Sequence, residues 1–492
     1  RGHRARGAAR PAALSRGSAR VKAIRSITTD RLVVFFLLLV PFAGAARFRI
    51  QDPDVWWHLA QGEWIVRHGA VPAEDVFSYT AGGREWLWYS WLAEVLFHAI
   101  VDSVGFRGLV WLQAVVATAT IGFVYLACRA AGARTAVGAV VVALAACSTA
   151  FAWFVRPLVF TLLFVAFLGW AIRSERLAAK LAWIAPPLLA VWANVHILFP
   201  AGVALLGFAA ACRAFDGKPS RRLWIATGLS ALATLANPYG WRLLGYVLVM
   251  ARQGAVAPEV VEFHSPGFHG VFGLMVGGFL FVALATLAWS RERASAFDLG
   301  TFVGSLFLGL LMRRNMALFA ILAAPVVAWH LERLLPAPKS PRDPEPRLLA
   351  LNGALLLAGL GFAASCLPRS GDWRDHVQTE DLPIAAAELV AEKHQGARLL
   401  NDFNWGGYLI YRLFPKTRVA IDGRTPVYEH ILRPYMRMHY AERGWDELLR
   451  ACDSDVILWP ADGPFASLLR RLPEWAVEYE DETAVIFVRA ER

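Results

Sequence analysis

Charged residues are scarce in this chain. Asp, Glu, Lys and Arg make up 18% of its 492 residues, whereas a soluble globular chain carries about 25%. Hydrophobic residues make up 57%, against about 45–50% in a soluble chain. They gather in long apolar runs, and about 20 such residues cross the roughly 30 Å hydrocarbon core of a bilayer. The composition therefore excludes an ordinary soluble enzyme and indicates a protein with many membrane spans.

Signatures of several other protein classes are missing. The five cysteines show no zinc-type spacing, and nothing requires a disulfide between Cys366 and Cys452. The sequence contains neither a phosphate-binding loop nor a nucleophile elbow. Arg47 and Arg49 follow the first apolar run where a signal peptide would have small residues, so we expect this run to remain as a span.

The positive charge is concentrated near the N-terminus. Much of the net charge of +11 lies in residues 1–30, where Asp30 is the single acidic residue. The basic residues of the tail are Arg1, Arg4, Arg6, Arg10, Arg16, Arg20, Lys22 and Arg25. Basic residues beside a span mark its cytoplasmic side, so residues 1–30 are predicted to be a cytoplasmic tail. The charge is therefore a topology signal, and we expect no nucleic-acid partner.

Apolar runs and charged connections predict a transmembrane domain over residues 31–366. The first span runs from about Leu32 to Ala46, and ten more follow at 107–128, 135–153, 157–172, 181–197, 198–213, 223–237, 269–290, 297–312, 315–331 and 347–365. Alternate connections are basic or rich in both charges and fall on the side of the tail. The other side receives a first external loop, 52–91, and the C-terminus.

The composition changes after Leu367. Residues 382–492 alternate helix-like stretches such as LPIAAAELVAEKH with strand-like runs such as SDVILW. This alternation predicts a small external α/β domain over 367–492. The fold class is thus mostly α, a polytopic membrane protein of about eleven spans with a small C-terminal α/β domain.

An acidic pair opens the first external loop. Asp52 is positioned to cap a helix whose first residue is Pro53. One stripe of that helix is apolar, which predicts that it lies along the membrane surface: Trp57, Ala60, Trp64 and Ile65. Asp54, His58 and Gln61 share another face, at spacings that bring side chains together on a helix.

The acidic pair after span one, the surface helix and the many spans together resemble the GT-C superfamily of membrane glycosyltransferases. In that superfamily the first external loop carries an acidic motif such as D-x-D, and the donor is a sugar on a polyprenyl phosphate or diphosphate. The resemblance covers roughly residues 25–370, with Asp52-Pro53-Asp54 at the place of the motif. DPDVWWHLAQGEWI, NDFNWGGYL and IDGR also resemble bacterial membrane families of this kind whose activities are mostly unassigned.

The resemblance implies a base, a cationic phosphate site and a groove for the lipid tail. Asp54 is the first choice of base, and Asp52 supports it or shares a divalent metal such as Mg²⁺ or Mn²⁺ with it. Capping and the helix dipole alone would also account for such a pair.

Arginines at the external ends of spans are candidates for the phosphate site. Arg156, Arg313 and Arg314 lie there against the charge bias, and arginine binds phosphate in a bidentate manner. The alternatives are snorkelling and pairing with external acids.

Polar residues near the same boundary complete the predicted substrate site. They are His58 on the surface helix, Asn194 and His196 in a span broken by prolines, and Glu262 and His264 in the loop 238–268. A helix–helix hydrogen bond would also explain Asn194, and solvent exposure would explain the loop. Asp422-Gly423-Arg424 indicates either an ordinary turn or a binding loop.

The sequence therefore predicts a multi-pass enzyme of the bacterial inner membrane, with its C-terminal domain periplasmic. Its partners would be membrane lipid, a polyprenyl-phosphate sugar donor and an acceptor that the sequence does not identify. A transporter or flippase of lipid-linked saccharide would usually show inverted repeats, and we find none. A non-catalytic envelope assembly protein is the third hypothesis.

Overall fold

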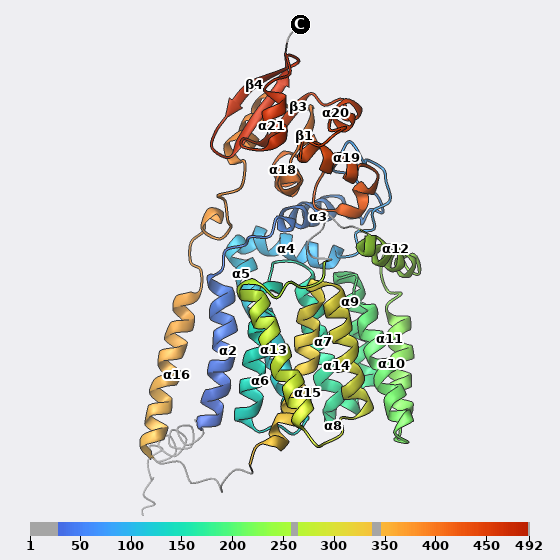
Figure 1. The fold of residues 1–492 in the computed structure, drawn as a ribbon, viewed down its shortest axis with the longest axis vertical. Coiled ribbons are helices and arrows are strands. Elements are labelled where there is room, and N and C mark those ends of the chain that lie inside the picture. The colour runs from blue at the N-terminus through green and yellow to red at the C-terminus, as the bar shows by residue number, and fades with distance from the viewer. Residues whose placement is uncertain (1–27, 257–263, 337–345, 491–492) are drawn as a thin grey trace, which may run out of the picture.

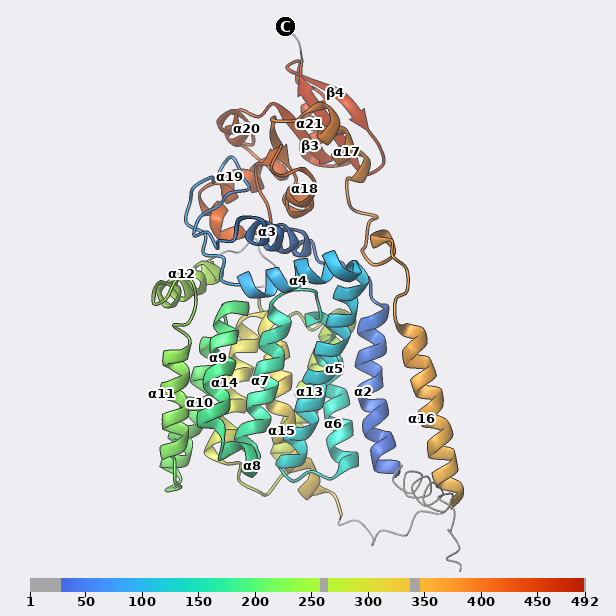
Figure 2. The ribbon, with the colours of Figure 1, turned by 180° about the vertical axis from the view of Figure 1, so that it is seen from behind.

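The computed structural model describes residues 28–256, 264–336 and 346–490. The described chain has three layers: a bundle of roughly parallel helices, a thin layer of helices across one end, and a mixed α/β domain beyond that layer (Figures 1 and 2). Most of the predicted basic tail, including Arg1 to Arg25, lies outside the described residues.

The bundle contains the long apolar helices. They are α2 (Thr29–Arg47), α5 (Phe106–Ala130), α6 (Thr135–Ser148), α7 (Leu158–Arg173), α9 (Leu181–Val195), α10 (Pro200–Phe215), α11 (Arg221–Ala233), α13 (Gly270–Trp289), α14 (Ala296–Leu311), α15 (Met316–Leu334) and α16 (Pro346–Cys366). Short turns connect some of them: η1 (Ala150–Ala152), α8 (Glu175–Ala178) and η3 (Arg313–Asn315).

These helices coincide with the predicted spans but differ in length. By length and composition, five helical segments of the described chain can cross a membrane: α2, α5, α13, the η3–α15 segment and α16. Five more are apolar but shorter, namely α6, α7, α9, α10 and α14, and α11, where we predicted the span 223–237, has 13 residues. Since a helix rises about 1.5 Å per residue, these helices are shorter than the roughly 30 Å core. Broken backbone at their ends is tolerated where neighbouring protein surrounds it.

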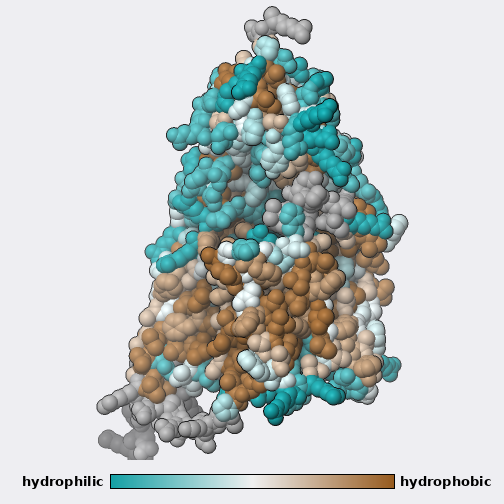
Figure 3. Space-filling model, in the orientation of Figure 1, coloured by the Kyte–Doolittle hydropathy of each residue, from teal (hydrophilic) through white to brown (hydrophobic). Residues whose placement is uncertain are grey.

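The outer surface of the bundle is apolar. Figure 3 shows a brown band across the visible face of the bundle, with hydrophilic residues on the C-terminal domain and at the opposite end. Large side chains stand exposed on this band, among them Leu274 and Phe281 on α13 and Leu357 on α16. Such a continuous exposed apolar surface marks contact with lipid. The chain is therefore a multi-pass membrane protein.

The middle layer consists of α3 (Asp54–His68), α4 (Trp91–Val104) and α12 (Arg242–Val256). The prediction that α3 lies along the membrane surface was wrong, because α3 is sandwiched between α4 and α18 of the C-terminal domain. Trp57, Ala60 and Ile65 are accordingly buried in protein. The helix also begins one residue later than predicted, at Asp54.

The C-terminal domain is built on a five-stranded mixed sheet of order β2-β1-β3-β5-β4. The strands are β1 (Arg398–Asn401), β2 (Arg418–Val419), β3 (Val456–Pro460), β4 (Trp475–Glu480) and β5 (Ala484–Arg489). β1 pairs in parallel with β2 and β3, whereas β5 runs antiparallel to β3 and β4. The mostly α fold with a small C-terminal α/β domain is thus confirmed.

Helices surround this sheet. They are η4 (Trp373–Asp375), α17 (Ile384–Lys393), η5 (Phe403–Trp405), α18 (Gly406–Leu413), η6 (Thr425–Tyr428), α19 (Glu429–His439), α20 (Asp446–Cys452) and α21 (Pro464–Leu469). The first external loop joins the edge of the sheet, because Ser78 pairs in parallel with Val419 of β2 and Tyr79 N–H donates to Val419 O at 3.1 Å. The loop thereby covers an edge strand that would otherwise be open.

Candidate functional site

The two acids of the D-x-D motif share one arginine. Arg156 lies just before α7, and its guanidinium pairs with the Asp52 carboxylate through Nε and with Asp54 Oδ2 through a terminal nitrogen at 3.3 Å. Residues about a hundred positions apart thus meet at the boundary between the bundle and the middle layer. Of the predicted site residues, the structure brings these three into direct contact.

Asp52 and Asp54 occupy different environments. The Asp52 side chain is 1% exposed and its Oδ1 accepts a hydrogen bond from the Asp54 backbone N–H at 2.9 Å. The Asp54 side chain is 20% exposed. Asp52 is therefore placed to fix the start of α3 and to hold Arg156, while Asp54 is the more exposed of the two acids.

Further charged and phenolic groups face this acid pair. Tyr89 is buried close enough to Asp54, Arg156 and Arg314 for their charges to act on its phenol. Burial, followed by the neighbouring Glu94, raises the pKa of Tyr89 above its usual value. Arg314, on η3, therefore shares the neighbourhood of the acids, and Tyr89 is a site residue that the sequence analysis did not single out.

A buried pair lies one helical turn beyond Asp54. His58 Nδ1 is 3.1 Å from Glu94 Oε1 of α4, and both side chains are nearly inaccessible to solvent. The Gln61 nitrogen, in the orientation that satisfies its neighbours, donates to both Glu94 oxygens at 2.7 and 3.0 Å, and its oxygen accepts from Trp86 Nε1 at 2.9 Å. Glu94 was also missed, since nothing in the sequence relates it to a helix 36 positions earlier.

Burial shifts the pKa values of both residues. It lowers the pKa of His58 well below 6.5, and the charge of Arg156 lowers it further. Burial also raises the pKa of Glu94 well above its usual value, against the opposing charge of Arg424. Both shifts favour the uncharged forms of the two side chains.

The other predicted polar residues have separate roles in the structure. Asn194 makes only internal bonds: its oxygen accepts from Trp91 Nε1 at 2.7 Å, and its nitrogen donates to the Ala190 and Ala236 carbonyls. It also lines an apolar pocket of about 500 Å³ between α4 and α9. His196 Nδ1 lies 2.8 Å from Thr161 Oγ1, and the ring is near enough to His58 to influence the pKa of that residue.

The remaining candidates lie around η3. Arg313 faces a pocket of about 230 Å³ beside α13, and its backbone N–H donates to the His264 carbonyl at 2.8 Å. Glu262 lies outside the described residues. The structure thus places Arg313 and Arg314 on different sides of one short turn.

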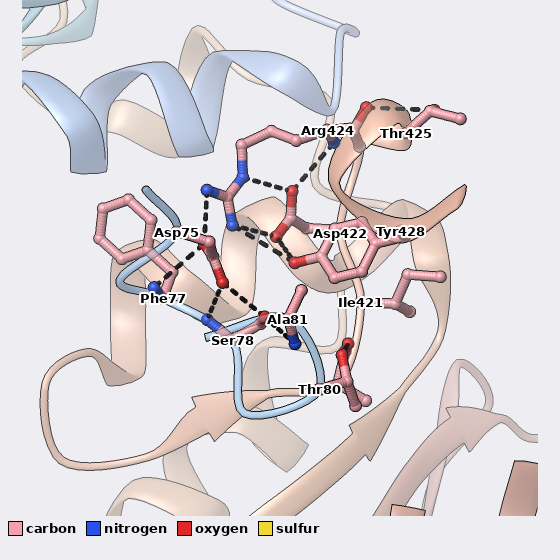
Figure 4. Close-up of polar contacts among 12 residues, drawn as sticks. Asp75, Phe77, Ser78, Thr80, Ala81, Ile421, Asp422, Arg424, Thr425 and Tyr428 are labelled. Carbon is pink, nitrogen blue, oxygen red and sulfur yellow. Dashed lines mark hydrogen bonds and ion pairs between the residues drawn. The ribbon is translucent and has the colours of Figure 1, made fainter. Parts of the chain in front are cut away.

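A buried ionic cluster fastens the C-terminal domain to the first external loop (Figure 4). Arg424 is fully buried and pairs with Asp75 of the loop at 2.7 Å and with Asp422 at 2.7 Å. Tyr428 donates to Asp422 at 2.5 Å, and Ser78 donates to Asp75 at 2.6 Å. Burial alone would raise the pKa of Asp75, but Arg424 and hydrogen bonds from residues 77 and 78 hold it below its usual value.

The chain resembles solved structures, whereas comparison of its sequence with protein families and curated proteins finds no match. The oligosaccharyltransferase AglB of Archaeoglobus fulgidus, solved with a peptide and a dolichol-phosphate, matches 87% of this chain and 69% of its own, with a TM-score of 0.55 and 10% identity. The arabinofuranosyltransferase AftD from Mycobacteria matches 94% of this chain and 42% of its own, at TM-score 0.51 and 14% identity.

These likenesses define the class of fold. At such low identity they show that the chain has the fold of the GT-C membrane glycosyltransferases, as the D-x-D motif indicated. The match to ArnT from Cupriavidus metallidurans, solved with undecaprenyl phosphate, extends over 94% of this chain and 98% of that chain, with TM-score 0.50 and 15% identity.

The buried Glu94 predicts a pH-dependent stability. Its raised pKa means that unfolding releases a proton above the ordinary glutamate pKa of about 4.3, so its contribution to stability declines as pH rises from there. We expect Glu94→Gln to raise the melting temperature relative to the wild type increasingly between pH 5 and pH 8. Glu63→Gln on the partly exposed side of α3 is the control; equal pH dependence in all three proteins would show that the pKa of Glu94 is not raised.

The Arg424 cluster predicts that replacing one of its carboxylates by an amide strongly destabilises the fold. Asp75→Asn removes one partner of a buried cation, which typically costs about 3–5 kcal/mol. We expect a marked fall in melting temperature at pH 7, whereas Glu74→Gln, an exposed neighbour, leaves it nearly unchanged. Similar melting temperatures for the two variants would show that Arg424 does not depend on Asp75.

Proposed function

We propose that the chain is a glycosyltransferase that moves a sugar from a polyprenyl-phosphate donor to an acceptor at the external face of a bacterial inner membrane. The observation that carries this proposal is the acid pair of the D-x-D motif, bound to Arg156 where a GT-C-type bundle meets the C-terminal domain. AglB and ArnT were solved with a dolichol-phosphate and with undecaprenyl phosphate, which supports a lipid-phosphate donor.

Asp54 is the base in this proposal. It is the more exposed of the two acids and lies at the first turn of α3, whereas Asp52 is buried against Arg156. A carboxylate there takes the proton of the acceptor hydroxyl as the sugar–acceptor bond forms and the bond from the sugar to the phosphate breaks. Asp52 keeps Arg156 and the start of α3 in place.

Arg156 and Arg314 receive the leaving phosphate. Both lie near Asp54 and Tyr89, at the membrane boundary where a lipid-linked phosphate would enter. Arginines held in place stabilise the negative charge that develops on the leaving oxygen. Arg313 is adjacent in sequence to Arg314, and His196 lies near His58. We therefore assign Arg313 and His196 to the outer parts of the donor site.

A divalent ion is compatible with the same site. Among the described residues, no group of three or more His, Cys, Asp or Glu side chains is arranged to bind a metal ion, but Mg²⁺ commonly uses one or two carboxylates together with substrate phosphates. Asp52 and Asp54 would hold it, and it would add positive charge at the donor phosphate. Activity that survives EDTA would assign this charge to Arg156 and Arg314; activity lost and then restored by Mg²⁺ or Mn²⁺ would assign part of it to the metal.

The first test compares the two acids. We expect Asp54→Asn to lower kcat by about 10²–10⁴-fold, the typical contribution of a general base, in a transfer assay with radiolabelled polyprenyl-phosphate sugars in lipid. We expect Asp52→Asn to lower kcat and also to weaken donor binding, because Arg156 loses its buried partner. No transfer by wild type across a broad donor panel would instead favour transport of a lipid-linked saccharide, and full activity of Asp54→Asn would exclude it as the base.

The phosphate site gives a second prediction. We expect Arg314→Gln to weaken donor binding roughly tenfold to hundredfold, as the loss of a charge-assisted hydrogen bond of about 1.5–3 kcal/mol implies. Binding of undecaprenyl phosphate to purified protein measures this directly. Arg293→Gln, an exposed residue in the connection between α13 and α14, is the control; equal donor affinity in both variants would remove Arg314 from the site.

A further inference from the structure

The C-terminal domain approaches the D-x-D motif through glycines. A Cβ placed on Gly407 would lie 2.9 Å from the Pro53 carbonyl oxygen and 3.3 Å from a Trp57 ring carbon. A Cβ placed on Gly423 would lie closer than 3.0 Å to Asp54 Oδ1 and 3.2 Å from Trp57 Nε1. The motif that should carry the chemistry is thus in contact with backbone of a different domain.

Asp54 is enclosed from two sides. One carboxylate oxygen, Oδ2, faces Arg156 of the bundle, and the other, Oδ1, faces the Cα of Gly423. The position of this carboxylate is therefore determined jointly by the bundle and by the C-terminal domain.

Gly423 has no freedom to retreat. Its two neighbours, Asp422 and Arg424, belong to the buried ionic cluster: Arg424 Nε and backbone N–H both donate to Asp422 Oδ1, at 2.8 and 3.0 Å, and Arg424 also pairs with Asp75. Figure 4 shows how this cluster holds residues 422 and 424 on either side of the glycine. A side chain added at 423 must therefore move Asp54 rather than the loop.

The backbone conformation of Gly423 does not require glycine. Gly423 does not have a positive φ, so an alanine at this position meets no left-handed backbone strain. The group that an added methyl meets most closely is the carboxylate of Asp54, which must move to make room for it. A misplacement of a reacting group by about 1 Å costs up to about 10²-fold in rate.

We propose that Gly423, clamped between Asp422 and Arg424, is a positioning residue that sets the place of the Asp54 carboxylate. The C-terminal domain is then a structural part of the catalytic site. This inference rests on the proposed function for its effect on rate, whereas the contact itself is independent of it.

Activity tests the proposal through a double-mutant cycle. We expect Gly423→Ala to lower kcat at least tenfold while the donor KM changes less than about twofold. In the Asp54→Asn background the same substitution should cost little more, because both changes act through one carboxylate. Gly371→Ala, a glycine with nothing within 4 Å of its Cβ, is the control and should behave as wild type.

Two outcomes of this cycle would overturn the proposal: an unchanged kcat for Gly423→Ala, or the same fold loss in both backgrounds. Wild type without transfer activity would count against the proposed function alone.

A stability cycle covers the case in which Gly423→Ala folds poorly. If the added methyl conflicts with Asp54, then Asp54→Ala makes room for it, and Gly423→Ala should lower the melting temperature in the wild-type background but not in the Asp54→Ala background. Equal losses of melting temperature in the two backgrounds would show that Gly423 does not press on Asp54. This result would stand whatever reaction the protein catalyses.

Discussion

A buried arginine joins the C-terminal domain to the segment 52–91. Arg424 has no solvent contact, so its charge is stable only while Asp75 and Asp422 both neutralise it. Asp75 comes from the first external loop and Asp422 from the C-terminal domain, which means that the two parts cannot separate without exposing or stranding the cation. The edge pairing of Ser78 with Val419 adds backbone hydrogen bonding to the same junction. The position of α3 between the bundle and the sheet follows from this attachment.

Much of the fold could be predicted from the sequence because it depends on composition and periodicity. Apolar runs predicted the helices of the bundle, and the alternation after Leu367 predicted β1, β2, β3 and β5 as well as α17, α20 and α21. β4 was missed because WAVEYE contains two glutamates and faces solvent along most of its length. The stripe Trp57, Ala60 and Ile65 was correctly recognised as apolar but assigned to lipid, because one sequence cannot show that the C-terminal domain covers it.

The candidate site was predictable only in its local part. The two acids are separated by one residue, and their position directly after the first span indicated a functional motif. Arg156 was singled out because it lies on the side of the membrane where the positive-inside rule disfavours basic residues. Glu94 and Tyr89 gave no such signal, since a glutamate in an aromatic segment reads as an exposed residue until its partners are known. The pairing of Arg424 with Asp75 joins positions about 350 residues apart, and the Asp-Gly-Arg stretch alone is equally typical of a surface turn.

The difference between the two acids shows how the surroundings divide chemistry between similar side chains. Asp52 is buried, bonded to the start of α3 and paired with Arg156, so it is held as an anion in one position. Asp54 Oδ2 lies 3.3 Å from the same guanidinium, and a fifth of its side chain is exposed. In the proposed reaction the acceptor hydroxyl must reach the base, and the partly exposed Asp54 allows this whereas the buried Asp52 does not. Arg156 contacts the Asp54 carboxylate on one side, and the backbone of Gly423 contacts it on the other. The proposed base, at the start of α3 in the middle layer, is thus positioned jointly by the bundle and by the C-terminal domain.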